Sequence, residues 1–324
     1  MKIKKQAKNY LKGLSALLLC GAGVANAGTG FIILGDGGTG LQGQYLVSNA
    51  IEQVCTDQQA CNFAVGLGDN IYEKGPNSST DQQFQDKFET PYQTLSFPFF
   101  MAMGNHDTTL LFAGDGGYNY RGNYEVAYTE NSDKWNMPAR YYGGETEDAL
   151  FVVYDSNPMG AYLPESGYWA PRGQFVQEQK AWVQQTMDAS DKTWKFAFAH
   201  HLYVSNGLSA YDIKPQGQGP NKEFIEEALC DRADFVFNGH EHAQQIINPK
   251  TGDCGVKTSF VITGTGAKSN STKRWFTWHS RQWESFGKLG FMHGYVDGAN
   301  FTLTTYVVEE DGSFTQAFQK TYTK

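Results

Sequence analysis

The sequence predicts an α/β fold with a substantial parallel sheet, and two features of the chain indicate it. Short apolar runs typical of buried strands lie at residues 31–34, 62–67, 99–103, 194–199 and 235–237. Helix-like segments lie between several of these runs, at residues 45–54, 81–95, 173–187 and 222–229. Strands that alternate with helices favour parallel pairing, and in such sheets ligands bind at the carboxyl ends of the strands.

The first 27 residues have the pattern of a secretory signal peptide. Five lysines and no acidic residue precede a short apolar run at 14–24, which ends at the small residues Ala25-Asn26-Ala27. The run is too short to span a bilayer, and a buried first helix would not explain the five lysines. Cys20 could indicate a lipid anchor, but Leu19 before it is bulkier than such a motif usually allows. We therefore expect an exported protein, periplasmic or secreted.

The remaining residues, 28–324, contain no linker and no internal repeat, so we expect a single domain. Removal of residues 1–27 would take away five of the 26 basic residues and none of the 34 acidic ones, leaving a net charge of about −13. A protein this acidic is a poor binder of nucleic acid. Because no later segment is apolar enough to be transmembrane, we also expect no stable membrane association. The sequence does not determine the oligomeric state.

Four cysteines follow the signal peptide, and an even number in an exported protein indicates disulfides. Cys55 and Cys61 flank a short helix-to-strand loop, and Cys230 and Cys254 bracket an apolar strand and its hairpin. We therefore expect these two local pairings. None of the four lies in a CxxC motif, which argues against a zinc finger or a redox site.

Each of the five apolar runs leads into a polar cluster. The clusters are GDGG at 35–38, GDNIY at 68–72, GNHD at 104–107, AHH at 199–201 and GHEH at 239–242. One cluster alone is weak evidence, because an Asp after a strand is more often a turn former or a helix cap. The GDGG turn also lacks the spacing of a phosphate-binding loop. Five clusters at successive strand ends, however, would meet at one edge of the sheet.

The residue types in these clusters indicate a metal site. Five of the seven histidines lie there, and Asp, Asn and His suit iron, zinc or manganese better than copper(I). His240 and His242, just past a strand end, can turn toward two neighbouring ions, and Asp69 can bridge them. A pair of ions about 3.5–4 Å apart can clamp a phosphoryl group and convert bound water to hydroxide.

Taken in order, the five clusters resemble the motifs of the calcineurin-like metallophosphoesterases. Tyr72, three residues after Asp69, is similar to the tyrosine of the purple acid phosphatases. The sequence Trp135-Asn136-Met137-Pro138 resembles the small, tartrate-resistant type. The resemblance covers nearly all of the mature chain. It implies a four-layer α/β sandwich, with two central mixed β-sheets packed face to face and helices outside.

The resemblance also implies a ligand for each position of a dinuclear centre. The first ion, ferric in the family, would be held by Asp36, Asp69, Tyr72 and His242. The second ion, Fe(II), Zn or Mn, would be held by Asp69, Asn105, His200 and His240. His200 is preferred to His201 because it directly follows the small residue Ala199. His106 would donate to a phosphate oxygen or to the leaving group.

Two segments depart from the family pattern or add to it. The loop after His200 usually supplies another histidine, but residues 202–221 contain none, so the leaving-group acid stays open between His106, His201 and water. Residues 114–117, with tyrosines at 118, 120 and 124, could rim the substrate entrance, although a solvent-facing hairpin is favoured.

An aromatic segment follows the Gly-rich turn at 264–267, and it too has two interpretations. Its aromatic side chains, with His279 among them, could stack on an aromatic leaving group, although packing is the more common role. The aromatic residues are Trp275, Phe276, Trp278, Trp283 and Phe286.

The expected reaction is acid-phosphatase hydrolysis of phosphate monoesters, by attack of a metal-bound hydroxide on small phosphorylated substrates. A phosphodiesterase or nucleotidase remains open, because the motifs position a phosphoryl group and not its substituent. A non-catalytic phosphate-binding protein is a more remote alternative, since no expected ligand is missing. A serine hydrolase is disfavoured because the chain has no GxSxG motif.

Overall fold

The computed structural model describes residues 28–57, 60–208, 219–248, 254–273 and 279–324. The expected signal peptide at 1–27 lies outside these residues. Among the helices of the described part, none combines the length and the apolar character that crossing a membrane requires.

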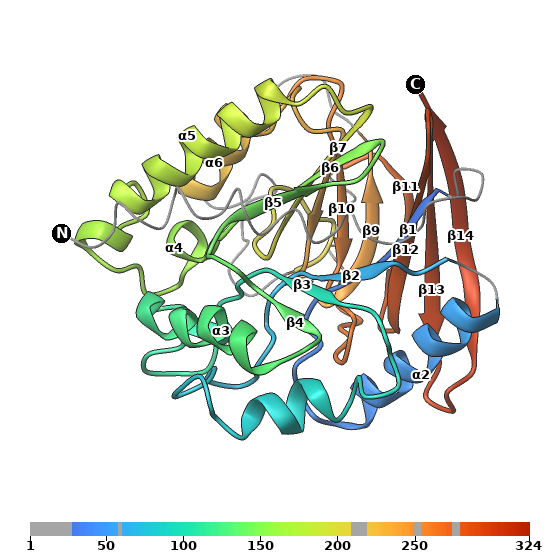
Figure 1. Cartoon of the computed structure of the whole chain (residues 1–324), viewed down its shortest axis with the longest axis horizontal. Coiled ribbons are helices and arrows are strands. Elements are labelled where there is room, and N and C mark those ends of the chain that lie inside the picture. The colour runs from blue at the N-terminus through green and yellow to red at the C-terminus, as the bar shows by residue number, and fades with distance from the viewer. Residues whose placement is uncertain (1–27, 58–59, 209–218, 249–253, 274–278) are drawn as a thin grey trace.

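Two seven-stranded sheets form the centre of the molecule (Figure 1). The first sheet contains, in spatial order, β14 (Phe314–Thr323), β13 (Asn300–Val308), β12 (Leu289–Asp297), β1 (Thr29–Leu34), β2 (Phe63–Gly66), β3 (Phe99–Met101) and β4 (Trp135–Asn136). The second contains β11 (Arg281–Phe286), β9 (Ala243–Ile247), β10 (Ser259–Thr263), β8 (Phe235–Asn238), β7 (Trp194–Ala199), β6 (Ala149–Val153) and β5 (Tyr142–Glu145).

The centre of each sheet is parallel, and the edges are mostly antiparallel. In the first sheet β1, β2, β3 and β4 pair in parallel, with Ile33 opposite Val65, while β12 joins β1 antiparallel. In the second sheet β6, β7, β8 and β10 are parallel. β9 pairs antiparallel with β10, β11 pairs antiparallel with β9, and β5 pairs antiparallel with β6. The parallel strands of each sheet therefore end along one edge, where ligands of α/β proteins bind.

The two sheets pack face to face through phenylalanine rings, and the alternation along β7 shows why. Phe196 and Phe198 point into the core that both sheets share, whereas Ala197 and Ala199 point toward the helices on the other face. Phe31 of β1 meets Phe151 of β6 across the interface, with ring centroids 5.1 Å apart. A strand buried on both faces is apolar throughout, which explains the continuous runs in the sequence.

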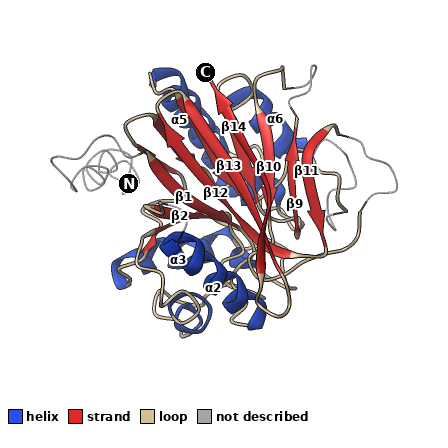
Figure 2. Cartoon of the chain, turned by 90° about the vertical axis from the view of Figure 1, so that its right-hand side faces the viewer, coloured by secondary structure: helices blue, strands red, loops and turns tan. Residues whose placement is uncertain are grey.

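Helices cover the outer faces. On the second sheet α5 (Gln174–Ala189) and α6 (Gly219–Ala228) pack with the short α4 (Asn157–Gly160) over a second core cluster. On the other side α2 (Gln42–Asp57) contacts β12 and β13, and α3 (Gly122–Tyr128) lies below the sheets (Figure 2). This architecture confirms the predicted α/β sandwich of two mixed sheets flanked by helices.

The segment at 81–95 is not the continuous helix that its sequence indicates. It contains one π-helical turn, Gln85–Glu89, followed by irregular turns. Pro91 has no N–H, so the carbonyl of Lys87 receives no helical hydrogen bond from it. That carbonyl instead accepts a bond from the Gln44 side chain at 2.6 Å. A single proline thus ends the regular helix and ties the segment to α2.

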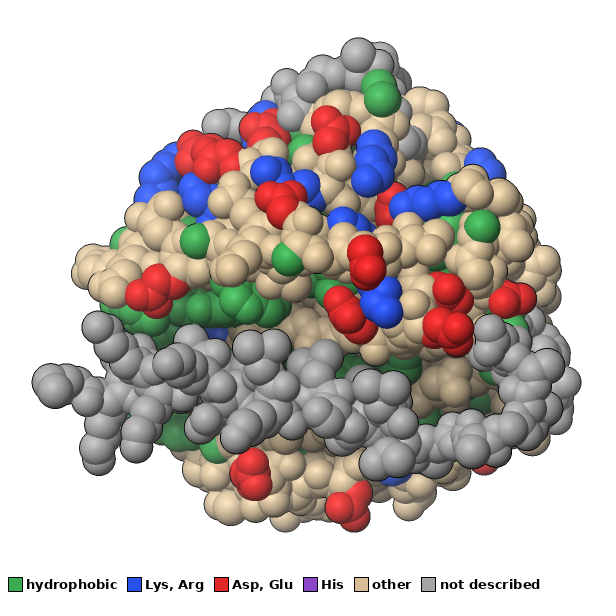
Figure 3. Space-filling view, turned by 45° about the horizontal axis from the view of Figure 1, so that its top comes forward, with side chains coloured by type: hydrophobic (Ala, Val, Ile, Leu, Met, Phe, Trp, Pro, Cys, Tyr) green, Lys and Arg blue, Asp and Glu red, His purple; other side chains and the backbone are tan. Residues whose placement is uncertain are grey.

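Both expected disulfides are present. Cys55, near the end of α2, bonds to Cys61, and Cys230, between α6 and β8, bonds to Cys254. The ion pair Lys180–Glu227 connects α5 to α6, and Arg172, two residues before α5 begins, pairs with Glu223 of α6. On the face shown in Figure 3, basic and acidic side chains are interspersed among the described residues.

Candidate metal centre

The carboxyl ends of the central strands of both sheets meet, and they bring the predicted ligands together. Asp36 follows β1, Asp69 follows β2, and Asn105 follows β3. From the second sheet, His200 follows β7, and His240 and His242 follow β8. Asp36, Asp69 and His200 each offer a ligand atom, and these atoms lie within 4.8 Å of one another. The side chains form two groups joined by Asp69.

The first group contains Asp36, Tyr72 and His242. The Tyr72 hydroxyl lies 2.9 Å from Asp36 Oδ1 and 3.1 Å from His242 Nε2, and these last two atoms are 3.2 Å apart. Burial, followed by the charge of Asp36, raises the pKa of the Tyr72 phenol well above its usual value. The phenol therefore stays protonated in this pocket unless a cation compensates for the phenolate charge.

The second group contains Asn105, His200 and His240. Asn105 Oδ1 lies 2.8 Å from His200 Nε2 and 3.0 Å from His240 Nδ1, and the two nitrogens are 3.1 Å apart. His200 Nδ1 faces the carbonyl oxygen of Leu67 at 2.8 Å, so this nitrogen carries the proton and Nε2 presents a lone pair. Burial is the main reason that the pKa of His240 falls to about 3, so the His240 ring is neutral.

Asn105 is oriented in the same way as the two histidines. Its Nδ2 donates to the carbonyl oxygen of Gly114 at 2.7 Å, which turns Oδ1 toward the two rings. In the tautomer that carries its proton on Nδ1, His200 Nε2 and Asn105 Oδ1 are two acceptors only 2.8 Å apart. Converging lone pairs of this kind fit a bound cation, and a backbone partner on the far nitrogen is typical of a metal-binding histidine.

Asp69 connects the two groups. Its Oδ1 lies 3.3 Å from His200 Nε2 and accepts a bond from the backbone N–H of His106 at 2.9 Å. The charge of its carboxylate also contributes to the raised pKa of the Tyr72 phenol, after burial and the charge of Asp36. Burial opposes ionisation, but His200 and His106 outweigh it, and the pKa of Asp69 lies well below its usual range. Asp69 is therefore an ionised carboxylate placed between two sets of donor atoms.

The backbone is strained at three of these positions. Asp36, Asp69 and His240 have φ values of 60°, 54° and 65°, in the left-handed region that residues with a side chain rarely adopt. Such strain clusters at functional sites. Gly104 permits the close approach of the loops, because a Cβ there would lie 2.1 Å from the backbone nitrogen of Asp69.

His106 lies beside the two groups and not within them. Its Nδ1 is 2.8 Å from the carbonyl oxygen of Glu73, so Nδ1 carries the proton and Nε2 is left to face Asp69 Oδ2 at 4.0 Å. The ring also contacts Tyr72, with centroids 4.3 Å apart. The side chain is 16% exposed, which gives it access to a molecule bound above Asp69.

His201 lies behind the candidate ligands, where it cannot reach a leaving group. It is only 3% exposed, its Nδ1 contacts Ser156 Oγ at 3.0 Å, and its ring packs against His240 with centroids 4.9 Å apart. Burial and the neighbouring histidines hold the pKa of His201 well below its usual value. Of the three candidates for the leaving-group acid, which are His106, His201 and water, His201 is therefore disfavoured, because a buried imidazole that does not become an imidazolium ion is too weak an acid to protonate a leaving group.

The GDGG segment at 114–117 is not a solvent-facing hairpin, since all four residues are buried. Asp115 holds the loop together by accepting bonds from the backbone N–H groups of Leu110, Leu111, Phe112 and Gly117. The loop in turn supplies the Gly114 carbonyl that orients Asn105. Sequence analysis missed this role of Asp115, although an Asp between glycines is a recognisable signal for a turn.

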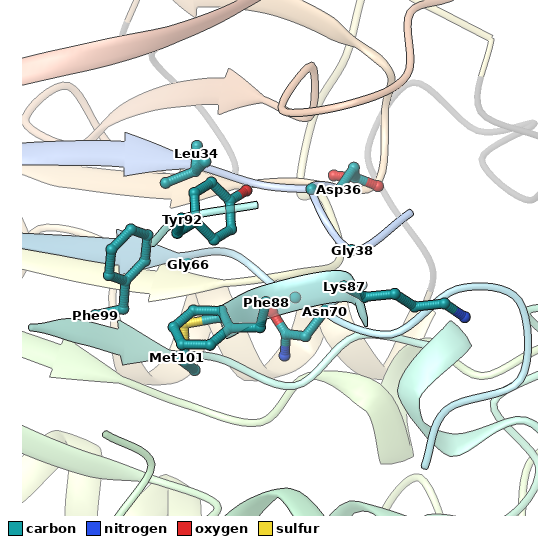
Figure 4. Close-up of a pocket in the computed structure, with 12 residues that line it drawn as sticks. Leu34, Asp36, Gly38, Gly66, Asn70, Lys87, Phe88, Tyr92, Phe99 and Met101 are labelled. Atoms are coloured by element: carbon teal, nitrogen blue, oxygen red, sulfur yellow. The ribbon is translucent and has the colours of Figure 1, made fainter. Parts of the chain in front are cut away.

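A small cavity lies behind Asp36 (Figure 4). Its volume is about 20 Å³, room for about one water molecule. Asp36, Asn70 and Lys87 form part of its lining, and Phe88 and Phe99 close the apolar side. A phosphate ester does not fit in this cavity. The site reaches solvent instead at His106 and His242, whose side chains are 16% and 28% exposed.

The aromatic segment is only partly described. Trp275, Phe276 and Trp278, for which stacking and packing were both considered, lie outside the described residues. Trp283 in β11 packs against Phe318, with ring centroids 6.3 Å apart, which agrees with the packing interpretation at that position.

Comparison with known proteins identifies the fold and the family. Residues 31–244 match the calcineurin-like phosphoesterase family. Tartrate-resistant acid phosphatase type 5 of Mus musculus is 30% identical over 275 residues, covering 78% of this chain and 73% of the relative.

Two solved structures share the fold at low sequence identity. GAP50, described as the anchor in the inner membrane complex of Plasmodium, has a TM-score of 0.70 and 18% identity, covering 92% of this chain and 89% of that one. Purple acid phosphatase PPD1 from yellow lupin (Lupinus luteus) has a TM-score of 0.65 and 17% identity, and the match covers 92% of this chain and 54% of the lupin chain. The chain belongs to the calcineurin-like phosphoesterase family, and purple acid phosphatases of the tartrate-resistant type are among its relatives.

Proposed function

We propose that this protein is an exported acid phosphatase that hydrolyses monoesters of small phosphorylated substrates at a centre of two metal ions. The convergence of two donor groups on the Asp69 carboxylate carries the proposal. Asp36, Tyr72 and His242 would hold one ion, and Asn105, His200 and His240 the other. When bound, the ions would activate water and neutralise the charge on the phosphoryl oxygens.

The chain's own residues would prepare the site and assist the leaving group. The Leu67 and Gly114 carbonyls hold His200 and Asn105 with their lone pairs turned inward. His106 is fixed by its bond to the Glu73 carbonyl, so its exposed Nε2 is the atom that would exchange a proton with a phosphate oxygen or the leaving group.

Tyr72 supports ferric iron as the ion of the first group. A phenol with a raised pKa ionises only beside a strong Lewis acid, and ferric iron is strong enough at mildly acidic pH. The second ion would be Fe(II), Zn or Mn. Iron-loaded, oxidised protein should show a visible charge-transfer band, and Tyr72→Phe should lose it. A colourless, fully loaded and active wild type would exclude the phenolate–iron pair while leaving the phosphatase proposal in place.

Export is supported by the two disulfides, since these persist mainly in oxidising compartments. We propose cleavage after Ala27, with a soluble acidic protein acting on small molecules and not on nucleic acid. Cell fractionation and N-terminal sequencing should find a periplasmic or secreted protein that begins at Gly28. Full-length protein retained in the cytoplasm would contradict this part of the proposal.

The activity is tested on protein purified without chelators. We expect two metal ions per chain and faster turnover of 4-nitrophenyl phosphate than of its bis-ester, with Asp69→Ala inactive. Faster turnover of the bis-ester would identify a phosphodiesterase. A fully loaded protein that turns over neither compound would indicate a non-catalytic role. The fold allows such a role, because the same fold occurs in the protein described as an anchor.

A further inference from the structure

A lysine lies directly over the ring of Tyr72. Lys268 Nζ is 3.5 Å from the centroid of the Tyr72 ring, well inside the range of a cation–π contact. The same ammonium group forms an ion pair with Glu73 Oε1 at 3.0 Å. Lys268 belongs to none of the five motifs, and the proposed function gives it no role.

The backbone around Lys268 is tied to the candidate ligands on both sides. Two residues before it, the N–H of Gly266 donates to the carbonyl oxygen of Gly35 at 2.9 Å, next to Asp36. Two residues after it, the N–H of Asn270 donates to the carbonyl oxygen of His242 at 2.8 Å. The position of Lys268 over the ring therefore follows from the same loops that place the first group of donor atoms.

Solvent screens the charge of Lys268 only weakly from the Tyr72 ring. Tyr72 is 2% exposed and the Lys268 side chain is 29% exposed, so little water separates the ammonium group from the ring. The opposing charge on Glu73 is 57% exposed, and solvent screens it more strongly. A positive charge beside a phenolate stabilises electrons on the ring, which makes the oxygen a weaker electron donor to any metal ion it binds.

We propose that Lys268 is a positioning residue that sets the donor strength of Tyr72, and with it the colour and the reduction potential of the ion held there. The inference rests on the proposed phenolate–iron pair. The proposed effect comes from the positive charge of Lys268 and not from the size or shape of its side chain. A residue of equal length without charge should lose the effect, and another cation should keep it.

The test compares Lys268→Met with Lys268→Arg in iron-loaded, oxidised protein of equal metal content. Charge transfer moves an electron away from the ring, so loss of the cation should lower the transition energy. We expect the band of Lys268→Met at longer wavelength, by on the order of 10 nm, and its reduction potential below that of wild type. Lys268→Arg should resemble wild type in both measurements.

Lys288→Met is the matched control, because Lys288 forms a comparable exposed ion pair with Glu309 at 2.5 Å. It should leave the band and the potential unchanged. A band and a potential that also do not move in Lys268→Met would overturn the inference while leaving the phenolate–iron pair intact. A wild type without any band would instead refute the pair, and the inference with it.

Discussion

The loop at 109–117 offers a direct test of how the chain orients one of its proposed ligands. Asp115 is fully buried and accepts four backbone N–H bonds, at 2.7 Å from Leu110, 2.5 Å from Leu111, 2.9 Å from Phe112 and 2.9 Å from Gly117. In Asp115→Asn, one of the two carboxylate oxygens becomes an NH₂ group that cannot accept. Two of the N–H donors then lose their acceptor, and the negative charge disappears.

The number of hydrogen bonds lost in Asp115→Asn sets the expected fall in the free energy of unfolding. A hydrogen bond to a charged group contributes about 1.5–3 kcal/mol, so the loss of two such bonds would cost about 3–6 kcal/mol. Leu111 and Phe112 are 69% and 42% exposed, so their freed N–H groups can bind water. We therefore expect the free energy of unfolding of Asp115→Asn to fall by about 3 kcal/mol, the lower end of this range, in urea denaturation followed by circular dichroism.

The same substitution should weaken the second ion selectively. A loosened loop no longer holds the Gly114 carbonyl against Asn105, so the amide can rotate its oxygen away from His200. Metal analysis should show loss of the second ion while the first is retained. Asp133→Asn, at an exposed aspartate, is the control and should change neither quantity. An Asp115→Asn protein with wild-type stability and full occupancy of both ions would refute the reasoning.

The stability difference should also depend on pH. Burial opposes ionisation of Asp115, but the four N–H donors outweigh it and lower its pKa. A lowered pKa means that the stabilisation is complete above the unfolded value of about 3.9 and is lost as pH falls through the folded value. The difference between wild type and Asp115→Asn should therefore be constant near pH 6 and shrink below about pH 4.

Three further substitutions test other parts of the molecule. His106→Ala should keep both ions and lose turnover by about 10²-fold or more, in metal analysis and steady-state kinetics, since it removes a proton-transferring group; loss of metal would show that it is a ligand. Asp69→Ala should empty the site, because it removes the carboxylate between the two groups. Replacing the Cys230–Cys254 pair, with a sequence separation of 24, by serines should lower the free energy of unfolding by about 3.5 kcal/mol in denaturation experiments. A denaturation midpoint of the serine variant equal to that of wild type would contradict the expected loss of stability.

Much of this protein follows from its sequence, for a local physical reason. Strands buried on both faces need continuous apolar residues, so β7 was predicted with its observed bounds, Trp194–Ala199. The polar clusters after such strands predicted that Asp36, Asp69 and His200 would meet. The two disulfides followed from cysteines that flank one short loop, in Cys55–Cys61, or bracket one strand and its hairpin, in Cys230–Cys254.

Tertiary structure alone decided which of these residues face one another and from which side. The family resemblance prefers His200 to His201, but only the fold shows the physical reason: the Leu67 carbonyl turns His200 inward, while His201 is buried behind His240. Lys268 is 195 residues from Glu73 along the chain and yet forms an ion pair with it beside Tyr72. Sequence patterns record the period of a strand or helix, whereas contacts between distant loops depend on how two whole sheets pack, which no local pattern encodes.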